Sequence, residues 1–245
     1  MEFFTWANSA ERPMGLFSGH HQLVLLFLFI WGIWVVRGYL KADRPKVYLI
    51  RAAWFIVFLE AVRHPPLLLT GQFVWGALPL HLCGIGVFIA LADAYWENKF
   101  TKEVLFMLTL PGAVVALATP DWIMQPTLNF FTMQSFIIHA WLVYYPLMRF
   151  IKGEIKPRLL NIWIPSVFLI GVLPLIRVIN YWLGTNFFFT EFAAPGTPLV
   201  FFEEQFGYFY IPSLVGLIFL VWLCLYGGLA GMSKWASRKN VSPSL

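Results

Sequence analysis

The chain of 245 residues is 60% hydrophobic and 19% aromatic, only 12% of its residues are charged, and its formal net charge is +5. A soluble domain of this length would carry about twice that charged fraction. The composition therefore excludes an ordinary soluble domain and indicates one integral membrane domain spanning 1–245. Basic loops beside membrane helices account for the positive charge, and without a basic-aromatic surface module we expect no nucleic-acid partner.

Seven apolar segments are long enough to cross a membrane, because a helix needs about 20 residues to span the hydrocarbon core. Backbone polar groups must be paired in lipid, so runs of this length predict helices. We therefore expect an all-α polytopic protein with seven transmembrane helices. The expected spans are 21–40, 46–66, 77–96, 102–119, 129–149, 159–182 and 208–232.

Positive charge marks alternate connections between these segments. Most Lys and Arg residues fall within 37–46, 99–102, 149–158 and 234–239. By the positive-inside rule this pattern predicts an external N-terminus and a cytoplasmic C-terminus. The longest connection, 183–207, is aromatic and acidic by turns; it fits either an interfacial loop that caps a cavity or a plain connector.

Polar side chains gather in the outer half of four expected spans. A charged residue near the centre of a membrane helix costs about 2.5–3.5 kcal/mol, so several at one depth predict a polar pocket. The alternative is that they reach the interface individually or form hydrogen bonds between helices. The group comprises Glu60, Arg63, His64, His81, Cys83, His139, Arg177, Asn180 and Tyr181.

A cysteine and a histidine in this group could form a nucleophile and its base. A thiolate attacks esters and a neighbouring imidazole can generate it, which singles out Cys83 and His139. His81 is a poorer base for Cys83, because it lies two positions away on the same segment. The opposing interpretation is that buried cysteine behaves as a small hydrophobe, as we assume for Cys224. The two cysteines offer neither a disulfide framework nor a zinc motif.

Four motifs resemble those of a known membrane protein family. They are LPLHLC (78–83), PGAVVALATPD (111–121), QSFIIHA (134–140) and INYWLGTNFFF (179–189). In this order and spacing they resemble the YwaF-type bacterial seven-helix membrane proteins, which are similar to eukaryotic transmembrane protein 164, regarded as a phospholipid acyltransferase. The resemblance implies a multi-pass protein of the bacterial plasma membrane.

The resemblance also implies an activity and a set of site residues. Cys83 falls on the proposed nucleophile and His139 on its histidine partner, so we expect a cofactor-independent and metal-independent acyltransferase, transacylase or acyl-ester hydrolase. It would act on a phospholipid or lysophospholipid within the membrane lipids; the sequence indicates no oligomeric state. The forked donors of arginine suit a phosphate, and Asn180, Tyr181 or the amides freed near Pro79 could donate to an oxyanion. The substrate-binding candidates are Arg63, His64, His81, Gln134, Arg177, Asn180 and Tyr181.

Other functions remain open at this point. A transporter or channel could use the same pocket as an outer vestibule, since prolines interrupt five spans as in many carriers, and Glu60 or Asp93 could then couple protons. Haem could use His81 and His139, and a zinc hydrolase could use several of the histidines with Asp121. A photoreceptor would need a lysine deep in 208–232, which is absent, and a serine hydrolase would need GxSxG.

Overall fold

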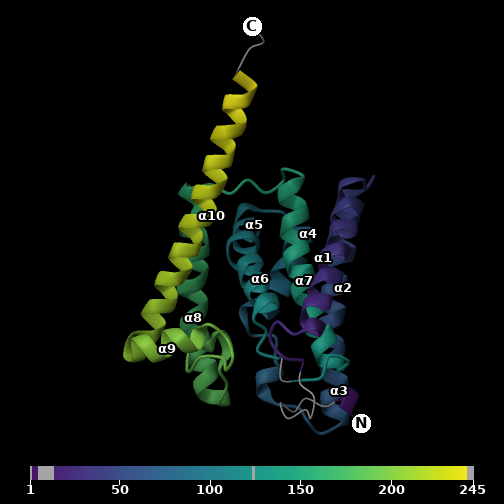
Figure 1. The fold of residues 1–245 in the computed structure, drawn as a ribbon, viewed down its shortest axis with the longest axis vertical. Helices are drawn as coiled ribbons and strands as arrows, with labels where there is room; N and C mark the ends of the chain where they lie inside the picture. Colours follow the sequence, from purple (N-terminus) through teal and green to yellow (C-terminus); the bar gives the residue numbers. More distant parts are fainter. Residues whose placement is uncertain (1, 5–13, 123–124, 242–245) are drawn as a thin grey trace.

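The computed structural model describes residues 2–4, 14–122 and 125–241, and within them all regular structure is helical. Figure 1 shows long helices running along one axis of the molecule. The α-helices are α1 (Gly19–Leu40), α2 (Pro45–Val62), α3 (His64–Leu69), α4 (Leu82–Tyr95), α5 (Lys99–Val104), α6 (Leu110–Ala118), α7 (Phe130–Ile151), α8 (Trp163–Leu183), α9 (Leu199–Phe206) and α10 (Tyr210–Val241). The shorter elements are η1 (Glu2–Phe4), η2 (Trp75–Ala77), η3 (Leu105–Thr109), η4 (Leu159–Asn161), η5 (Phe187–Phe189) and η6 (Gly207–Phe209).

Five helical stretches of the described chain are long and apolar enough to cross a membrane. They are Gly19–Leu40, Trp75–Tyr95, Lys99–Ala118, Leu159–Leu183 and Leu199–Gly231. The prediction of an all-helical, multi-pass membrane protein is therefore confirmed. The other two expected spans fold as α2 with α3 and as α7. Charged residues interrupt α2, and α7 is the helix with the most buried residues in the part that the structure describes.

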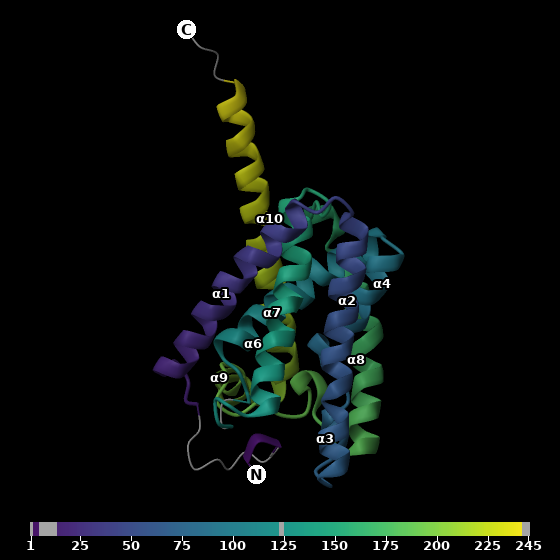
Figure 2. The same cartoon turned by 90° about the vertical axis from the view of Figure 1, so that its right-hand side faces the viewer.

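The helices form two groups. The larger group contains α1, α2, α4, α6 and α7, whose apolar side chains share one core, with Leu28, Ile56, Val87 and Leu142 in its centre. The smaller group contains α5, η3, α8 and α10, whose apolar side chains share a second core. Figure 1 shows α8, α9 and α10 on one side of the molecule, and Figure 2 shows that α8 lies apart from α9 and α10. Figure 2 shows α1 inclined across α7, and α10 extending beyond the rest of the molecule.

A proline explains how α10 joins the larger group. Pro111 has no N–H, so the carbonyl of Met107 loses its usual partner four residues later in the helix. The indole Nε1 of Trp222 donates to that carbonyl at 2.8 Å, and Trp222 is fully buried. The π-helical turn η3 therefore provides the attachment point for α10.

Two expected spans begin or end differently from the prediction, because of their prolines. The helix expected over 46–66 ends at Val62, and a separate helix starts at His64 with Pro65 in its first turn. The helix expected over 77–96 starts only at Leu82, after an extended backbone at Leu78 and His81. Proline is tolerated in the first turn of a helix but removes a hydrogen bond from its interior.

An ion network joins four helices at the end of the molecule where the α4–α5 and α7–α8 connections lie, called here the basic end. At its centre is Arg149, which is fully buried in α7 and forms ion pairs with Asp93, Glu97 and Glu154. Asp93 also accepts hydrogen bonds from Tyr145 at 3.1 Å and Thr101 at 2.6 Å. Glu154 in turn accepts a hydrogen bond from Tyr39 of α1 at 2.6 Å. We call these residues the ion network.

Candidate functional site

Cys83 lies in the first turn of α4, not in the interior of a helix. His81 is the N-cap residue, and its side chain does not cap the helix. The first backbone N–H groups of a helix have no partner within it, so the half-buried Cys83 thiol lies beside free amide donors. A thiolate is stabilised at a helix N-terminus.

The chain is tightly packed at this point because of a glycine. A Cβ atom added to Gly84 would lie 2.6–2.7 Å from the backbone of Pro79. No larger residue fits without moving the backbone, so Pro79 and Gly84 together fix the segment that leads into Cys83.

His139 is held in one orientation on α7. Its Nδ1 donates to the carbonyl of Ser135 at 2.7 Å, because a carbonyl can only accept. In the neutral imidazole Nε2 therefore carries the lone pair and can accept a proton. The ring of Trp122 stacks on the imidazole with centroids 4.7 Å apart, which keeps the ring in place.

The register of α4 and α7 places Cys83 and His139 at a similar depth. Cys83 precedes Asp93 by ten residues, and His139 precedes Arg149 by the same number. Asp93 and Arg149 form an ion pair, and α4 and α7 run in the same direction (Figure 1). Ten helical residues rise about 15 Å, so both side chains lie about that far from the ion pair.

A second pair of charged residues connects α2 with the segment before α4. Arg63 pairs with Glu60 at 2.6 Å, and its Nη2 also donates to the carbonyl of Ala77. His64 Nδ1 donates to the Glu60 carbonyl at 3.2 Å, and Gln134 of α7 donates to the carbonyl of Leu59 at 3.1 Å. The end of α2 is thus bound both to α7 and to the segment that precedes Cys83 in the chain.

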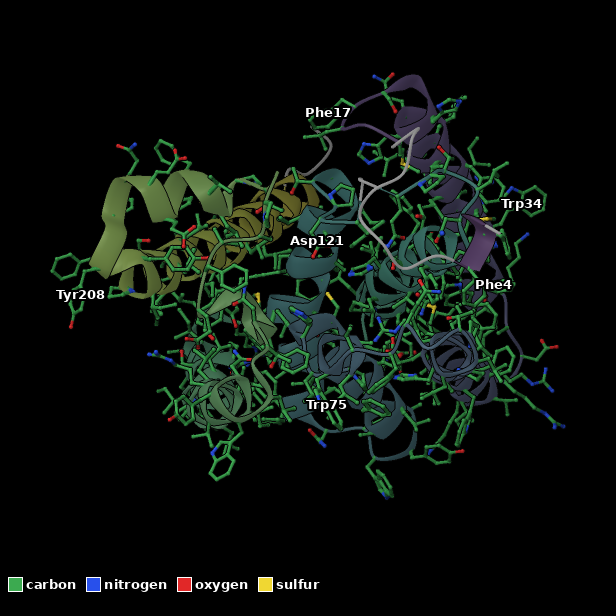
Figure 3. The ribbon with its side chains drawn as sticks, turned by 90° about the horizontal axis from the view of Figure 1, so that it is seen from below. Phe4, Phe17, Trp34, Trp75, Asp121 and Tyr208 are labelled. Atoms are coloured by element: carbon green, nitrogen blue, oxygen red, sulfur yellow. The ribbon has the colours of Figure 1, made fainter. Side chains whose placement is uncertain are left out.

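Several expected site residues lie within electrostatic range of one another. Cys83 is in range of Glu60 and Asp121, and His81 is in range of Arg63 and His139. We call Glu60, Arg63, His81, Cys83 and His139 the polar cluster. Figure 3 shows Asp121 near the middle of the molecule when it is viewed from the end opposite the basic end.

The polar cluster leaves some of its hydrogen-bonding capacity unused. Within the described chain no hydrogen bond joins the Cys83 thiol to His139. Three buried atoms in or beside the cluster have no hydrogen-bond partner among the residues that the structure describes: Arg63 Nε, Trp122 Nε1 and Gln134 Oε1. A buried unpaired polar atom costs about 1–3 kcal/mol. These atoms are therefore candidates for contact with a ligand.

The three expected substrate-binding residues of α8 lie outside the polar cluster. Arg177 is mostly exposed and lies 3.6 Å from Glu191. Tyr181 is 87% exposed on the helix surface. Asn180 is buried, and both N–H groups of its amide are used, one on the carbonyl of Phe187 and one on Thr190. The amide of Asn180 therefore shapes the loop after α8 and leaves no donor for an oxyanion.

That loop in turn covers His81. The backbone N–H of Phe188 donates to His81 Nδ1 at 3.3 Å. The rings of Phe187 and Phe189 contact the imidazole, with centroids 5.2 and 5.0 Å away. His81 thus connects the start of α4 to the loop after α8.

Sequence reasoning did not identify Trp122 and Gly84 as parts of the site. Trp122 follows α6 and reaches His139 only through the packing of α6 against α7, so no local spacing could identify it. Gly84 directly follows Cys83, and a glycine next to a candidate nucleophile was an available signal of close backbone packing. No group of three or more His, Cys, Asp or Glu side chains in the described chain is arranged to hold a metal ion.

Comparison with known proteins identifies a family for this chain. Residues 16–226 match the model of the TMEM164 family, which covers the helices from α1 into α10 and every residue of the polar cluster. No curated protein and no solved structure matches the chain. On the strength of the family match, the chain belongs to the TMEM164 family.

Proposed function

We propose that this protein is a membrane acyltransferase that moves an acyl chain from a phospholipid through a thioester on Cys83, with His139 as the base. The observation that carries the proposal is the fixed tautomer of His139. Its Nδ1 donates to Ser135, so Nε2 is the proton acceptor, at the depth of a cysteine in the first turn of a helix. Membership of the TMEM164 family is consistent with the expected lipid chemistry.

In the first half-reaction the thiol becomes a nucleophile. His139 Nε2 takes the proton from Cys83 Sγ, and the thiolate attacks the ester carbonyl carbon of the phospholipid. The carbonyl oxygen becomes an oxyanion, which the free amides at the start of α4 can stabilise. The intermediate then collapses: the ester C–O bond breaks, His139 returns the proton to the leaving alkoxide, and a lysophospholipid departs from the thioester.

In the second half-reaction the thioester is resolved. His139 Nε2 accepts the proton of a lysolipid hydroxyl, whose oxygen attacks the thioester carbonyl. The C–S bond breaks, and the thiolate of Cys83 recovers the proton from His139. Water in place of the lysolipid would release a free fatty acid by the same steps.

The proposal requires Cys83 and His139 to approach each other when substrate binds. Catalytic hydrogen bonds are often long in the free enzyme and shorten only in the complex. The buried and unpaired Nε of Arg63 is the proposed donor to the lipid phosphate, since guanidinium groups suit phosphate oxygens. Gln134 Oε1 is the proposed acceptor for a hydroxyl group of the lipid.

The proposed topology has seven spans, with α2 and α7 added to the five long apolar stretches. The start of α1 and the end of α10 lie at opposite ends of the molecule (Figure 1), which supports an odd number of crossings. Lys and Arg at the basic end place this end in the cytoplasm under the positive-inside rule. The proposed location is the plasma membrane of a bacterial cell.

A proton-coupled transporter is the second candidate, and the pairing of Glu60 makes it the weaker one. Coupling needs a carboxylate that binds and releases a proton during transport. Glu60 is 5% exposed and lies 2.6 Å from Arg63, and Asp93 belongs to the ion network. Both carboxylates therefore already have an arginine partner within the protein.

The direct test is acyl transfer by the purified protein in mixed micelles. The substrates are a phosphatidylcholine with a labelled acyl chain and an unlabelled lysophospholipid. We expect Cys83→Ala to abolish both transfer and the hydroxylamine-sensitive label on the protein. Cys224→Ala is the matched control, because this exposed cysteine lies on α10; it should leave both unchanged.

A second variant tests the base. His139→Asn keeps a donor for the Ser135 carbonyl but removes the proton acceptor, so we expect transfer to fall by about 10²-fold or more. Full transfer and full labelling by Cys83→Ala would refute the thioester mechanism. The transporter would be favoured by a different result: the wild type shows no acyl transfer but does take up a solute into vesicles, and Glu60→Gln abolishes that uptake.

A further inference from the structure

We propose a second ligand site, for a phosphate group, at the basic end of the molecule. A cavity of about 520 Å³ lies there between the α4–α5 connection, the start of α5 and the α7–α8 connection. It is at the opposite end of α4 from Cys83, so it is separate from the polar cluster. Its lining includes the cations Lys99, Lys102, Lys156 and Arg158 and the carboxylates Glu97, Glu103 and Glu154.

The three carboxylates are already engaged by the protein. Glu97 pairs with Lys102 at 3.2 Å and with Arg149 at 2.6 Å. Glu154 pairs with Arg149 at 2.9 Å and accepts the hydroxyl of Tyr39. Their negative charge therefore stabilises the ion network and is not available to attract a cation.

Glu103 forms the fixed wall of the cavity. Its side chain is 3% exposed and accepts hydrogen bonds from Asn161 and, at 3.0 Å, from the hydroxyl of Tyr226. The backbone N–H of Asn161 in turn donates to the carbonyl of Arg158 at 2.8 Å. Glu103 thus holds the α7–α8 connection against α5 and α10, and this positions Arg158 at the cavity.

Three cations remain without a carboxylate partner. In the part of the chain that the structure describes, Lys99, Lys156 and Arg158 form no ion pair, and all three are exposed. Lys99 and Arg158 approach the cavity from α5 and from the α7–α8 connection, two segments far apart in the sequence. Their combined charge attracts an anion.

The position of the cavity defines the chemistry of the ligand. Basic pockets between membrane helices at the cytoplasmic surface bind anionic lipid headgroups, and each Lys or Arg near the surface contributes a few-fold in affinity. Arginine provides forked donors that match phosphate oxygens. The ligand is thus a phosphate, either in the headgroup of an anionic lipid or as the free ion.

The test titrates the purified full chain in a non-ionic detergent with three probes. These are dihexanoyl phosphatidylglycerol, inorganic phosphate and dihexanoyl phosphatidylcholine, each measured by calorimetry on the Cys83→Ala protein so that no substrate is consumed. We expect phosphatidylglycerol to bind more tightly than phosphatidylcholine. Inorganic phosphate that binds and displaces the lipid identifies the free ion as sufficient; phosphate without effect identifies the lipid headgroup.

The variants locate the site. Replacing Lys99, Lys156 and Arg158 together by Gln should weaken phosphatidylglycerol binding by about tenfold or more. The matched control replaces three basic residues in and directly after the α1–α2 connection, Lys41, Arg44 and Lys46, by Gln and should bind like the wild type. If the triple variant unfolds at a lower temperature without ligand, the three single variants replace it.

Wild-type affinity in the triple variant, or an equal loss in the control, would overturn the proposal. Neither result depends on acyl transfer. Failure of this second site therefore leaves the function proposed for Cys83 untouched, and the reverse also holds.

Discussion

The ion network and the polar cluster both contain residues of α4 and α7, but they satisfy their polar groups differently. In the ion network every nitrogen of the Arg149 guanidinium has a carboxylate partner, and both oxygens of Asp93 accept hydrogen bonds. In the polar cluster the Nε of Arg63 is buried without a partner in the described part of the chain, as is the nearby Oε1 of Gln134.

This difference separates a structural role from a functional one. Buried polar groups are almost always paired, and an unpaired group in a native protein needs an explanation. The ion network holds α1, α4, α5 and α7 together and has nothing left to offer a ligand. The polar cluster keeps donors and acceptors that a bound lipid can use.

Removal of Arg149 is expected to have the largest effect. Arg149→Met would leave the buried carboxylate of Asp93 without its main partner, and the loss of one member of a buried ion pair costs about 3–5 kcal/mol. Chemical unfolding of the purified protein in detergent measures this cost. Lys152→Met is the control: Lys152 is partly exposed, lies 3.8 Å from Glu154 and should contribute less than about 1 kcal/mol. Equal losses in the two variants would mean that the ion network does not hold the helices together.

Steric packing, and not charge, should position the polar cluster. In Gly84→Ala the new Cβ would lie 2.6–2.7 Å from the backbone of Pro79, so we expect a cost of about 3 kcal/mol, at the upper end for overpacking. Alkylation of Cys83 by a maleimide should also change in rate. Gly76→Ala has open space around the new Cβ and should change neither stability nor rate. A Gly84→Ala protein as stable as Gly76→Ala would show that this contact is not needed.

The sequence predicted the all-helical membrane fold well, because the number of apolar residues needed to span lipid is a simple physical requirement. It predicted the helix boundaries less well at Arg63 and Leu82. Prolines were visible beside both positions, but the sequence did not show whether each proline would end the helix or be accommodated within it. The α10 attachment illustrates the same limit: Pro111 predicts a free carbonyl, yet nothing local identifies Trp222 as its donor.

The sequence predicted the candidate site in part. Glu60 and Arg63 are three residues apart on one helix, so their pairing follows from helical spacing. The surroundings of His139 depend on Trp122, which arrives from another helix. Asn180 was expected near the substrate, but its amide is used by a loop whose path could not be derived from local pattern.

Hydroxyl and indole groups allow a finer comparison of the two regions. Tyr145→Phe removes a hydrogen bond to Asp93 at 3.1 Å in the ion network, and we expect a cost of about 1.5 kcal/mol, as for other hydrogen bonds to charged groups. Trp122→Phe keeps an aromatic ring on His139 and removes an N–H that has no partner, so its cost should be close to zero. Unfolding free energies of the two variants in the same detergent provide the measurement. A larger loss in Trp122→Phe than in Tyr145→Phe would reverse the distinction between the two regions.

Acid should act on the exposed edge of the ion network, and there we expect the smallest effect. Burial alone would raise the pKa of Glu97, but Arg149 and Lys102 outweigh burial and hold the pKa below its ordinary value of 4.5. Because the pKa is lowered by folding, Glu97 contributes stability above its ordinary value and loses that contribution as the pH falls through the folded-state pKa. The thermal unfolding midpoint should therefore fall less in Glu97→Gln than in the wild type when the pH is lowered from about 6 to about 3.5. The difference should be small, because the Glu97 side chain is 37% exposed and water screens its ion pairs. Identical acid profiles for the two proteins would mean that Arg149 is held by Asp93 and Glu154 alone.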